Sequence, residues 1–177
     1  MNIDYSHRSP NHSKRVAGAV VSCIVLHADA DDHVESSLSW CMSPTSKVSY
    51  HYLIDRDGNA YELVDPSLVA WAVDPSEFPG ATVYTEAPGW EHGKPHLNGR
   101  SISVCFDDRN DGEPYTDEEV AAGVKICVAL MRRFPKITPD RITTHALVAR
   151  PLGRKTDPLG FDLEAFRQRV ARAGLVQ

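Results

Sequence analysis

The sequence contains no long hydrophobic run, which excludes a membrane-spanning helix. Its longest apolar stretch, Val20–Leu26, is interrupted by Ser22 and is far shorter than the roughly 20 apolar residues that a transmembrane helix needs. The opening segment, MNIDYSHRSPNHSKR, is polar and lacks the apolar centre of a secretory signal peptide. We therefore expect synthesis in a host cytoplasm and no membrane insertion.

A cationic excess is also missing. The chain carries 19 Lys and Arg against 24 Asp and Glu, a formal net charge of -5. Nucleic-acid-binding domains usually have a basic excess or a basic stripe. Nucleic acid is therefore not an expected partner.

Paired cysteines are missing as well. The four cysteines, Cys23, Cys41, Cys105 and Cys127, form no C-x-x-C pair, and three of them lie in apolar stretches where a thiol behaves as a small buried hydrophobe. A disulfide scaffold is not expected in a chain of this length and cysteine content. We expect four reduced thiols.

What the sequence does contain is the composition of one ordinary globular domain. Hydrophobic residues make up 42% of its 177 residues, enough for a core without disulfide support. No internal repeat or low-complexity linker divides the chain. We expect a single domain over residues 1–177, with a loose N-terminal arm at 1–17 and a catalytic core at about 20–172.

Hydrophobic patterning predicts strands that alternate with helices. Ala19–His27 is nearly continuous and β-branched, as in a strand buried on both faces. The turn sequence Asp57-Gly58 predicts a hairpin. The predicted strands are Ala19–His27, Ser49–Ile54, Ala60–Val64, Ser101–Phe106 and Asp140–Thr144.

Three segments have helical spacing of apolar residues. The clearest is Thr116–Arg133, where Thr116 and Glu119 form a capping box. The others are Asp31–Met42 and Phe161–Ala173, while 74–100 and 146–160 are predicted to be irregular. Together these elements predict an α/β fold with a central mixed β-sheet flanked by helices.

Two histidines and one aspartate are the candidate metal ligands. His27 closes one predicted strand, His145 follows another, and Asp157 lies in the next loop. Two imidazoles and a carboxylate fill three positions of a catalytic zinc ion and leave the fourth to water. A single histidine at a strand end is more often structural, and no local spacing connects His27 with His145. The residues alone therefore only suggest a Zn2+ site.

Four segments strengthen this hypothesis by resemblance. They are IVLHADA (24–30), SYHYLIDRDGNAYELV (49–64), SISVCF (101–106) and HALVARPLGRKTDP (145–158). In this order they resemble the N-acetylmuramoyl-L-alanine amidase type 2 family, which includes phage amidases, muropeptide-recycling amidases and peptidoglycan recognition proteins. The resemblance implies that family's fold and its zinc-dependent cleavage of the bond between N-acetylmuramic acid and L-alanine in peptidoglycan.

The resemblance also implies roles for individual residues. His27, His145 and Asp157 match the metal ligands, Lys155 matches a catalytic lysine, and Tyr50 matches a tyrosine near the metal. A lysine ammonium beside a metal can stabilise the oxyanion of a tetrahedral intermediate, and Tyr50 can orient water or substrate.

The other polar residues near these motifs are interpreted more simply. Arg154 is either a solvated loop residue or a ligand for a substrate carboxylate. His51 falls on the opposite face of its strand from Tyr50, which favours a structural role. The remaining histidines, His7, His12, His33, His92 and His96, are expected on the surface or in loops.

The chain departs from the family pattern at three places. Cys105 stands where recycling members carry a glutamate. Some phage members also have a cysteine at this place. Ala72 follows Trp71 where members often have a histidine, and the stretch between His145 and Asp157 is slightly long.

These features favour a monomeric phage or prophage endolysin that acts on the cell wall after release through a holin. Three alternatives stay open: a cytosolic recycling amidase, a non-catalytic peptidoglycan-binding module, and a cysteine hydrolase that uses Cys105.

Overall fold

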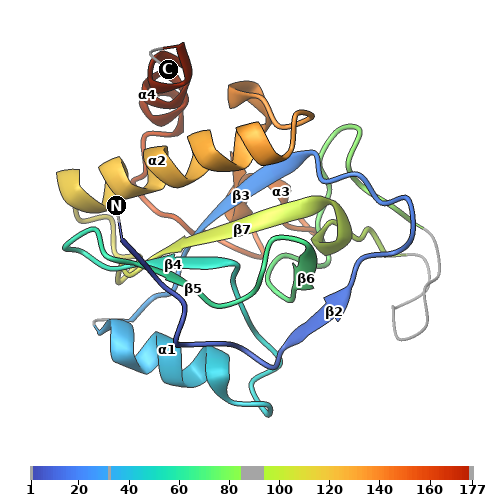
Figure 1. The fold of residues 1–177 in the computed structure, drawn as a ribbon, viewed down its shortest axis with the longest axis horizontal. Helices are drawn as coiled ribbons and strands as arrows, with labels where there is room; N and C mark the ends of the chain where they lie inside the picture. Colours follow the sequence, from blue (N-terminus) through green and yellow to red (C-terminus); the bar gives the residue numbers. More distant parts are fainter. Residues whose placement is uncertain (1, 32, 85–93, 176–177) are drawn as a thin grey trace.

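A computed structural model of the chain describes residues 2–31, 33–84 and 94–175 (Figure 1). Its centre is a six-stranded sheet. From edge to edge the strands are β1 (Ile3–Asp4), β5 (Ala60–Glu62), β4 (Tyr52–Ile54), β7 (Ser101–Phe106), β3 (Cys23–Ala28) and β8 (Ile142–Thr144). The hairpin strands β4 and β5 are antiparallel, whereas β4, β7, β3 and β8 run parallel. The predicted mixed sheet is confirmed.

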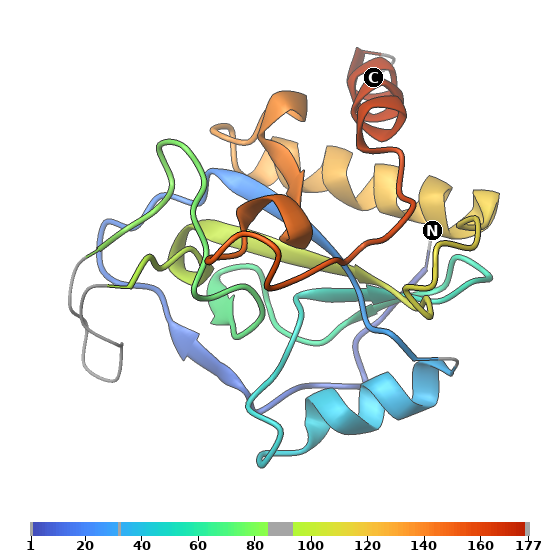
Figure 2. The same ribbon diagram turned by 180° about the vertical axis from the view of Figure 1, so that it is seen from behind.

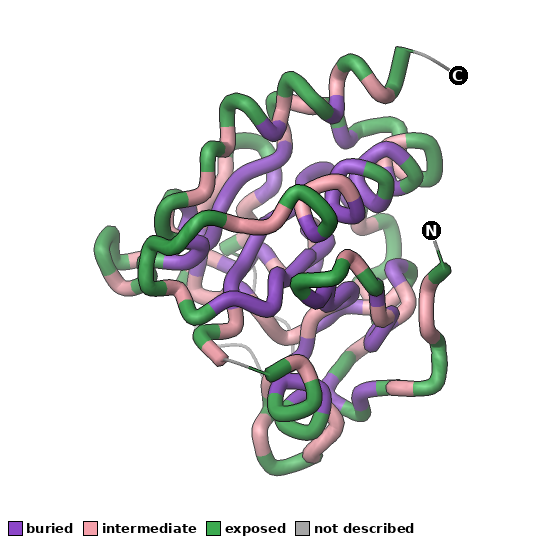
Figure 3. The backbone as a smooth tube through the Cα atoms, turned by 90° about the vertical axis from the view of Figure 1, so that its left-hand side faces the viewer, coloured by how far each residue is buried: buried purple, intermediate pink, exposed green. Residues whose placement is uncertain are grey.

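The two central strands are buried on both faces, as their uninterrupted apolar sequences predict. Every residue of β3 and β7 is buried, and their register places His27 beside Cys105. Figure 3 shows buried segments running through the middle of the molecule. This rigid centre carries the first candidate ligand.

Helices cover the two faces of the sheet unequally. Helices α2 (Asp117–Arg133) and α4 (Leu163–Leu175) lie over one face, where they form the main core. Helix α1 (Val34–Met42) lies on the opposite side of the sheet (Figures 1 and 2). The alternating side chains of β3 therefore place Ile24 and Leu26 in the main core and His27 on the face that α1 shares.

Helix α2 begins as its sequence predicts. The Thr116 side chain accepts a hydrogen bond from the Glu119 backbone N–H at 3.1 Å, and the Glu119 carboxylate accepts one from the Thr116 N–H at 2.6 Å. This reciprocal pair satisfies two backbone donors that the first turn leaves without helical partners.

The prediction of a loose N-terminal arm is wrong. Ile3–Asp4 pairs with β5, and β2 (His12–Lys14) forms a separate two-stranded sheet with β6 (Leu68–Ala70). Arg15 then donates hydrogen bonds to the carbonyls of Pro66 and Gly99, at 3.1 and 2.9 Å. The arm is ordered because its polar residues meet backbone acceptors from distant segments.

Smaller differences concern the ends of elements and the short helices. The loop predicted at 146–160 begins instead inside a short helix, α3 (His145–Val148). Short 3-10 helices precede β7 (η1, Asn98–Arg100) and β8 (η2, Pro139–Arg141). Over the described residues, no helix has both the length and the apolar character to cross a bilayer.

Candidate metal centre

Neighbouring parallel strands bring the two predicted histidine ligands together. His27 is the penultimate residue of β3, and His145 immediately follows β8, which pairs with β3. Their Nδ1 atoms lie 3.2 Å apart. Asp157 arrives from the loop after α3, and its Oδ2 lies 3.1 Å from His145 Nδ1 and 3.3 Å from His27 Nδ1.

Backbone and side-chain hydrogen bonds hold the loop that carries Asp157. The Ala146 N–H donates to the Asp157 carbonyl at 2.8 Å. The Arg154 guanidinium donates to the carbonyls of Val73 and Pro75, at 3.2 and 2.7 Å, and to that of Arg150 at 3.0 Å. Arg154 is therefore a bridge between two loops rather than a freely solvated side chain.

The three converging atoms have the spacing that a metal ion requires. Zinc–nitrogen and zinc–oxygen distances near 2 Å in a tetrahedron place neighbouring ligand atoms about 3.3 Å apart. The observed separations are 3.1–3.3 Å. Asp157 Oδ2 can accept a proton from each ring, but hydrogen bonds then leave the 3.2 Å approach of the two Nδ1 atoms unexplained, because two N–H donors do not bond to each other. The group can hold a metal ion.

The electrostatics of the group also suit a cation. Burial lowers the pKa of His27 to about 4, despite the opposing hydrogen bond to Asp157. Burial would raise the pKa of Asp157, but its hydrogen bonds to His145 and His27 outweigh that effect and the pKa is lowered. At neutral pH His27 is therefore neutral and Asp157 is ionised, the forms that bind metal.

The second ring nitrogen of each histidine, Nε2, is also buried. Within the described residues, His27 Nε2 and His145 Nε2 have no hydrogen-bond partner. If Nδ1 binds a metal ion, Nε2 carries the ring proton, and this nitrogen usually donates to a carboxylate or carbonyl. Within the described part of the chain, no outer hydrogen bond therefore orients either ring.

A cavity of about 290 Å³ opens over the centre, lined by Tyr50, His145, Lys155 and Asp157 among others. The Tyr50 ring centroid lies 5.2 Å from that of His27. Burial raises the pKa of Tyr50 well above its usual value, so its hydroxyl stays protonated. Lys155 is exposed at the rim. All five predicted site residues therefore gather at one place.

Comparisons with known proteins agree with this geometry. The family described as N-acetylmuramoyl-L-alanine amidase matches residues 17–160, which is most of the sequence. The chain belongs to the N-acetylmuramoyl-L-alanine amidase family. It is an enzyme of that class, and its fold is the amidase type 2 fold.

Three related proteins illustrate the likeness. The 1,6-anhydro-N-acetylmuramyl-L-alanine amidase AmpD of Haemophilus influenzae shares 26% identity, over 92% of this chain and 90% of the relative. The E. coli amidase AmiD, solved with anhydro-N-acetylmuramic acid-L-Ala-D-gamma-Glu-L-Lys, has a TM-score of 0.67 and 22% identity, over 88% of this chain and 60% of AmiD. A mutant endolysin from Bacillus subtilis has a TM-score of 0.65 and 16% identity, over 96% and 99%. The two structures show the shared fold.

His51 of this amidase has the structural role that strand alternation predicts. Its Nδ1 accepts a hydrogen bond from the Ser103 N–H at 2.9 Å, so its Nε2 carries the proton and faces the Leu68 carbonyl at 3.2 Å. Burial, followed by the charge of Arg15, lowers its pKa to about 3.

The other histidines were expected on the surface or in loops, and His96 lies in an irregular segment but is buried there. His96 is only 7% exposed, and its Nδ1 lies 3.2 Å from Asp74 Oδ2. His12 and His33 are exposed and His7 is half-buried, while His92 lies outside the described residues. Its burial is not apparent from the sequence, because its partner Asp74 lies 22 positions away.

Cys105 is unsuited to act as the nucleophile of a cysteine hydrolase. All four cysteines are free and buried, and burial raises the pKa of the Cys105 thiol well above its usual value. A nucleophilic cysteine needs a lowered pKa and some exposure. Cys105 instead packs beneath Tyr50 in an apolar cluster.

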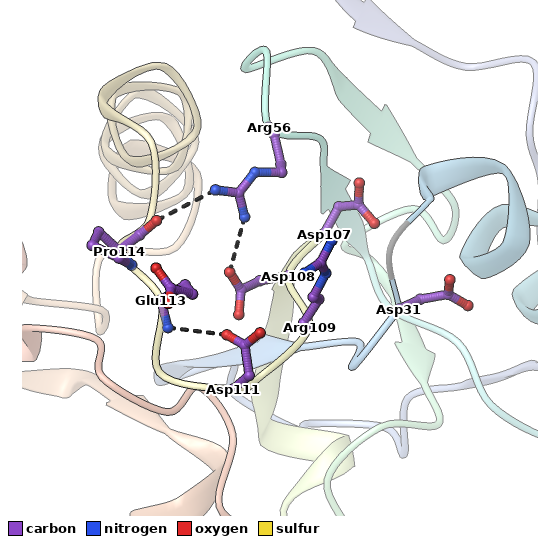
Figure 4. A pocket seen from close by; sticks show the side chains of 8 residues that line it. All are labelled: Asp31, Arg56, Asp107, Asp108, Arg109, Asp111, Glu113 and Pro114. Atoms are coloured by element: carbon purple, nitrogen blue, oxygen red, sulfur yellow. Dashed lines mark hydrogen bonds and ion pairs between the residues drawn. The ribbon is translucent and has the colours of Figure 1, made fainter.

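A second, more acidic cavity of about 540 Å³ lies beside the loop that follows β7 (Figure 4). One of its two buried carboxylates, Asp108, is already engaged: Oδ2 accepts from Arg56 at 3.2 Å and Oδ1 from the Asn110 N–H at 2.8 Å. Arg56 also donates to the Pro114 carbonyl at 3.4 Å. These contacts hold the loop in place beside the metal centre.

Asn110 is the residue at the centre that the sequence did not reveal. It lines the same cavity as Lys155 and Asp157 and adopts a left-handed backbone conformation with φ of 56°. Asparagine tolerates that conformation, but no sequence pattern indicates which asparagine uses it. Its position becomes apparent only when two loops meet.

Proposed function

We propose that this chain is a zinc-dependent N-acetylmuramoyl-L-alanine amidase, which hydrolyses the amide between the lactyl group of N-acetylmuramic acid and L-alanine in peptidoglycan. The convergence of His27, His145 and Asp157 within 3.1–3.3 Å of one another supports this proposal. Family membership supports the bond that is cut.

The side chains of the cavity have complementary roles in this reaction. His27, His145 and Asp157 would hold the zinc ion, which when bound would supply Lewis acidity at the scissile carbonyl. Lys155 places a positive charge at the rim, where it stabilises the oxyanion that develops on the carbonyl. Tyr50 donates a hydrogen bond that orients water or substrate.

The substrate class is inferred from the relatives. The AmpD relative is named for anhydro-N-acetylmuramyl-L-alanine, and AmiD was solved with an anhydromuramyl tripeptide. Both names contain the same muramyl–L-alanine linkage. We therefore take a muropeptide, or peptidoglycan itself, as the substrate of this chain. We also propose that the chain acts as a monomer.

The decisive experiment combines wall lysis with identification of the bond that is cut. Purified protein should clear a suspension of peptidoglycan sacculi and release new amino groups from L-alanine, without new reducing sugars. A chelator should stop both effects, and added zinc should restore them. Release of reducing sugars, or clearing that a chelator leaves unchanged, would show that the proposed reaction is wrong.

The cellular setting has two candidates. Cys105, in place of the glutamate of recycling members, favours an endolysin from a phage or prophage that acts on the intact wall. The match to AmpD along most of the chain favours a recycling enzyme that acts on soluble anhydromuropeptides. Turnover of sacculi and of soluble anhydromuropeptides at equal enzyme concentration separates the two, because an endolysin should prefer sacculi.

A binding module without activity is a weaker alternative. Such a protein needs only the cavity, whereas this chain also brings together three ligand atoms and a rim lysine. Tight binding of sacculi with no release of amino groups in the presence of zinc would favour the binding module over the enzyme.

A further inference from the structure

The loop that carries Lys155 and Asp157 contacts the loop that follows β7. The Asn110 side-chain amide donates to Thr156 Oγ1 at 3.1 Å, and its carbonyl oxygen accepts from the Leu159 N–H at 2.6 Å. Thr156 lies between Lys155 and Asp157, and Leu159 lies two residues beyond. One side chain thus holds the catalytic loop on both sides of a proposed ligand.

Asn110 is itself held firmly. Its N–H donates to Asp108, whose own N–H donates to Asp29 Oδ1 at 3.0 Å and whose carbonyl accepts from the Ala30 N–H at 3.0 Å. Arg56 donates to the other carboxylate oxygen of Asp108, a contact drawn in Figure 4. The anchor therefore extends back to the end of β3, two residues after His27.

The backbone of the two loops is also closely packed. A Cβ on Gly160 would lie 3.2 Å from the Gly112 carbonyl oxygen, so the loops touch where Asn110 joins them. On the other side, Arg154 ties the catalytic loop to 73–75 through carbonyl contacts. The Asn110 contacts add a second support to the same loop.

We infer that Asn110 is a positioning residue, which clamps the 155–159 segment so that Asp157 meets the two histidines and Lys155 faces the substrate carbonyl. This inference rests on the proposed zinc amidase. It assigns Asn110 no contact with the reacting atoms. Residues that orient metal ligands from outside typically change metal affinity or activity by about 10- to 100-fold when they are removed.

Three variants test the clamp. Asn110→Gly removes both side-chain hydrogen bonds and accepts the left-handed backbone without strain. Asn110→Asp retains the acceptor for Leu159, and the Thr156 hydroxyl can donate to its second oxygen. Thr156→Val removes one of the two hydrogen bonds. Lys47→Gly is the matched control, because Lys47 is exposed and has a similar φ of 52°.

Two measurements are needed for each variant: zinc affinity by competition with a chromophoric chelator, and kcat and KM on a soluble N-acetylmuramoyl peptide. For Asn110→Gly we expect a fall of about tenfold or more in both kcat and zinc affinity, with KM nearly unchanged. For Thr156→Val we expect both kcat and zinc affinity to fall by about threefold, as for the loss of one hydrogen bond. Asn110→Asp should remain close to the native enzyme, and Lys47→Gly should match it.

The outcomes separate the clamp from the reaction. A native enzyme that binds no zinc or cleaves no muropeptide contradicts the proposed function. If the native enzyme binds zinc and cleaves muropeptide, and Asn110→Gly keeps native zinc affinity and native kcat, then the clamp is overturned and the proposed function is not. Equal losses in Lys47→Gly would also overturn it, because the effect would then come from glycine rather than from the lost hydrogen bonds.

Discussion

The Nδ1 atoms of His27 and His145 lie 3.2 Å apart, although 118 positions separate the two residues in the sequence. The pairing of β3 with β8 explains this proximity, because parallel neighbours end at the same edge of a sheet. Two of the three proposed metal ligands therefore depend on the buried central strands.

Removal of one ligand should abolish both metal binding and turnover. His27→Ala deletes a nitrogen donor, and Asp157→Asn replaces the only charged ligand with a neutral amide. We expect the native chain to hold one zinc equivalent and each variant to lose it, as measured by metal analysis after dialysis. Added zinc should restore chelated native enzyme but neither variant. His12→Ala, an exposed histidine, is the control, and retained zinc in both ligand variants would refute the assignment.

Lys155→Ala should separate catalysis from metal binding. Because Lys155 lies at the exposed rim rather than among the ligand atoms, its loss should leave zinc content unchanged. Loss of a charge that stabilises an oxyanion typically lowers kcat by about 10²–10³-fold. Lys125→Ala, an exposed lysine of α2 on the other side of the sheet, should have native turnover. Native kcat in Lys155→Ala would remove the lysine from the mechanism.

Local patterns predicted the parts of the fold that local interactions determine. The bounds of β7, the hairpin at Asp57-Gly58 and the capping box at Thr116 were all predicted correctly. These elements follow from residues close in sequence. Strands β1, β2 and β6 were not predicted, because each is only two or three residues long and depends on a distant partner.

The candidate site follows the same division. The strand ends indicated His27 and His145, and the next loop suggested Asp157, while Lys155 and Tyr50 required the family resemblance. Asn110 remained hidden because its partners belong to a loop 46 or more positions away. The geometry of contacting loops has no counterpart in hydrophobic periodicity.

A glycine pair should show how tightly α2 packs on the sheet. A Cβ at Gly123 would lie 2.9 Å from the Phe106 ring and 3.4 Å from Phe166. Gly123→Ala should therefore lower the free energy of unfolding by about 1–3 kcal/mol through overpacking. Gly174→Ala has open space and should leave stability within about 0.5 kcal/mol or raise it. Urea unfolding measures both, and equal stability of the two variants would contradict the tight packing.

His51 should make the fold sensitive to acid. Its pKa is lowered to about 3 in the folded chain, whereas an exposed histidine in the unfolded chain titrates near 6.5. Between these values the unfolded chain binds a proton that the folded chain does not, so stability is lost as the pH falls below about 6.5. From pH 8 to 5.5 this linkage amounts to about 1.4 kcal/mol.

His51→Gln keeps an acceptor for the Ser103 N–H and a donor for the Leu68 carbonyl but cannot titrate. Urea unfolding of both proteins at the two pH values, with a chelator present throughout, should show that the native chain loses about 1.4 kcal/mol more than the variant. Equal losses would mean that His51 is protonated to the same extent in the folded and unfolded chains.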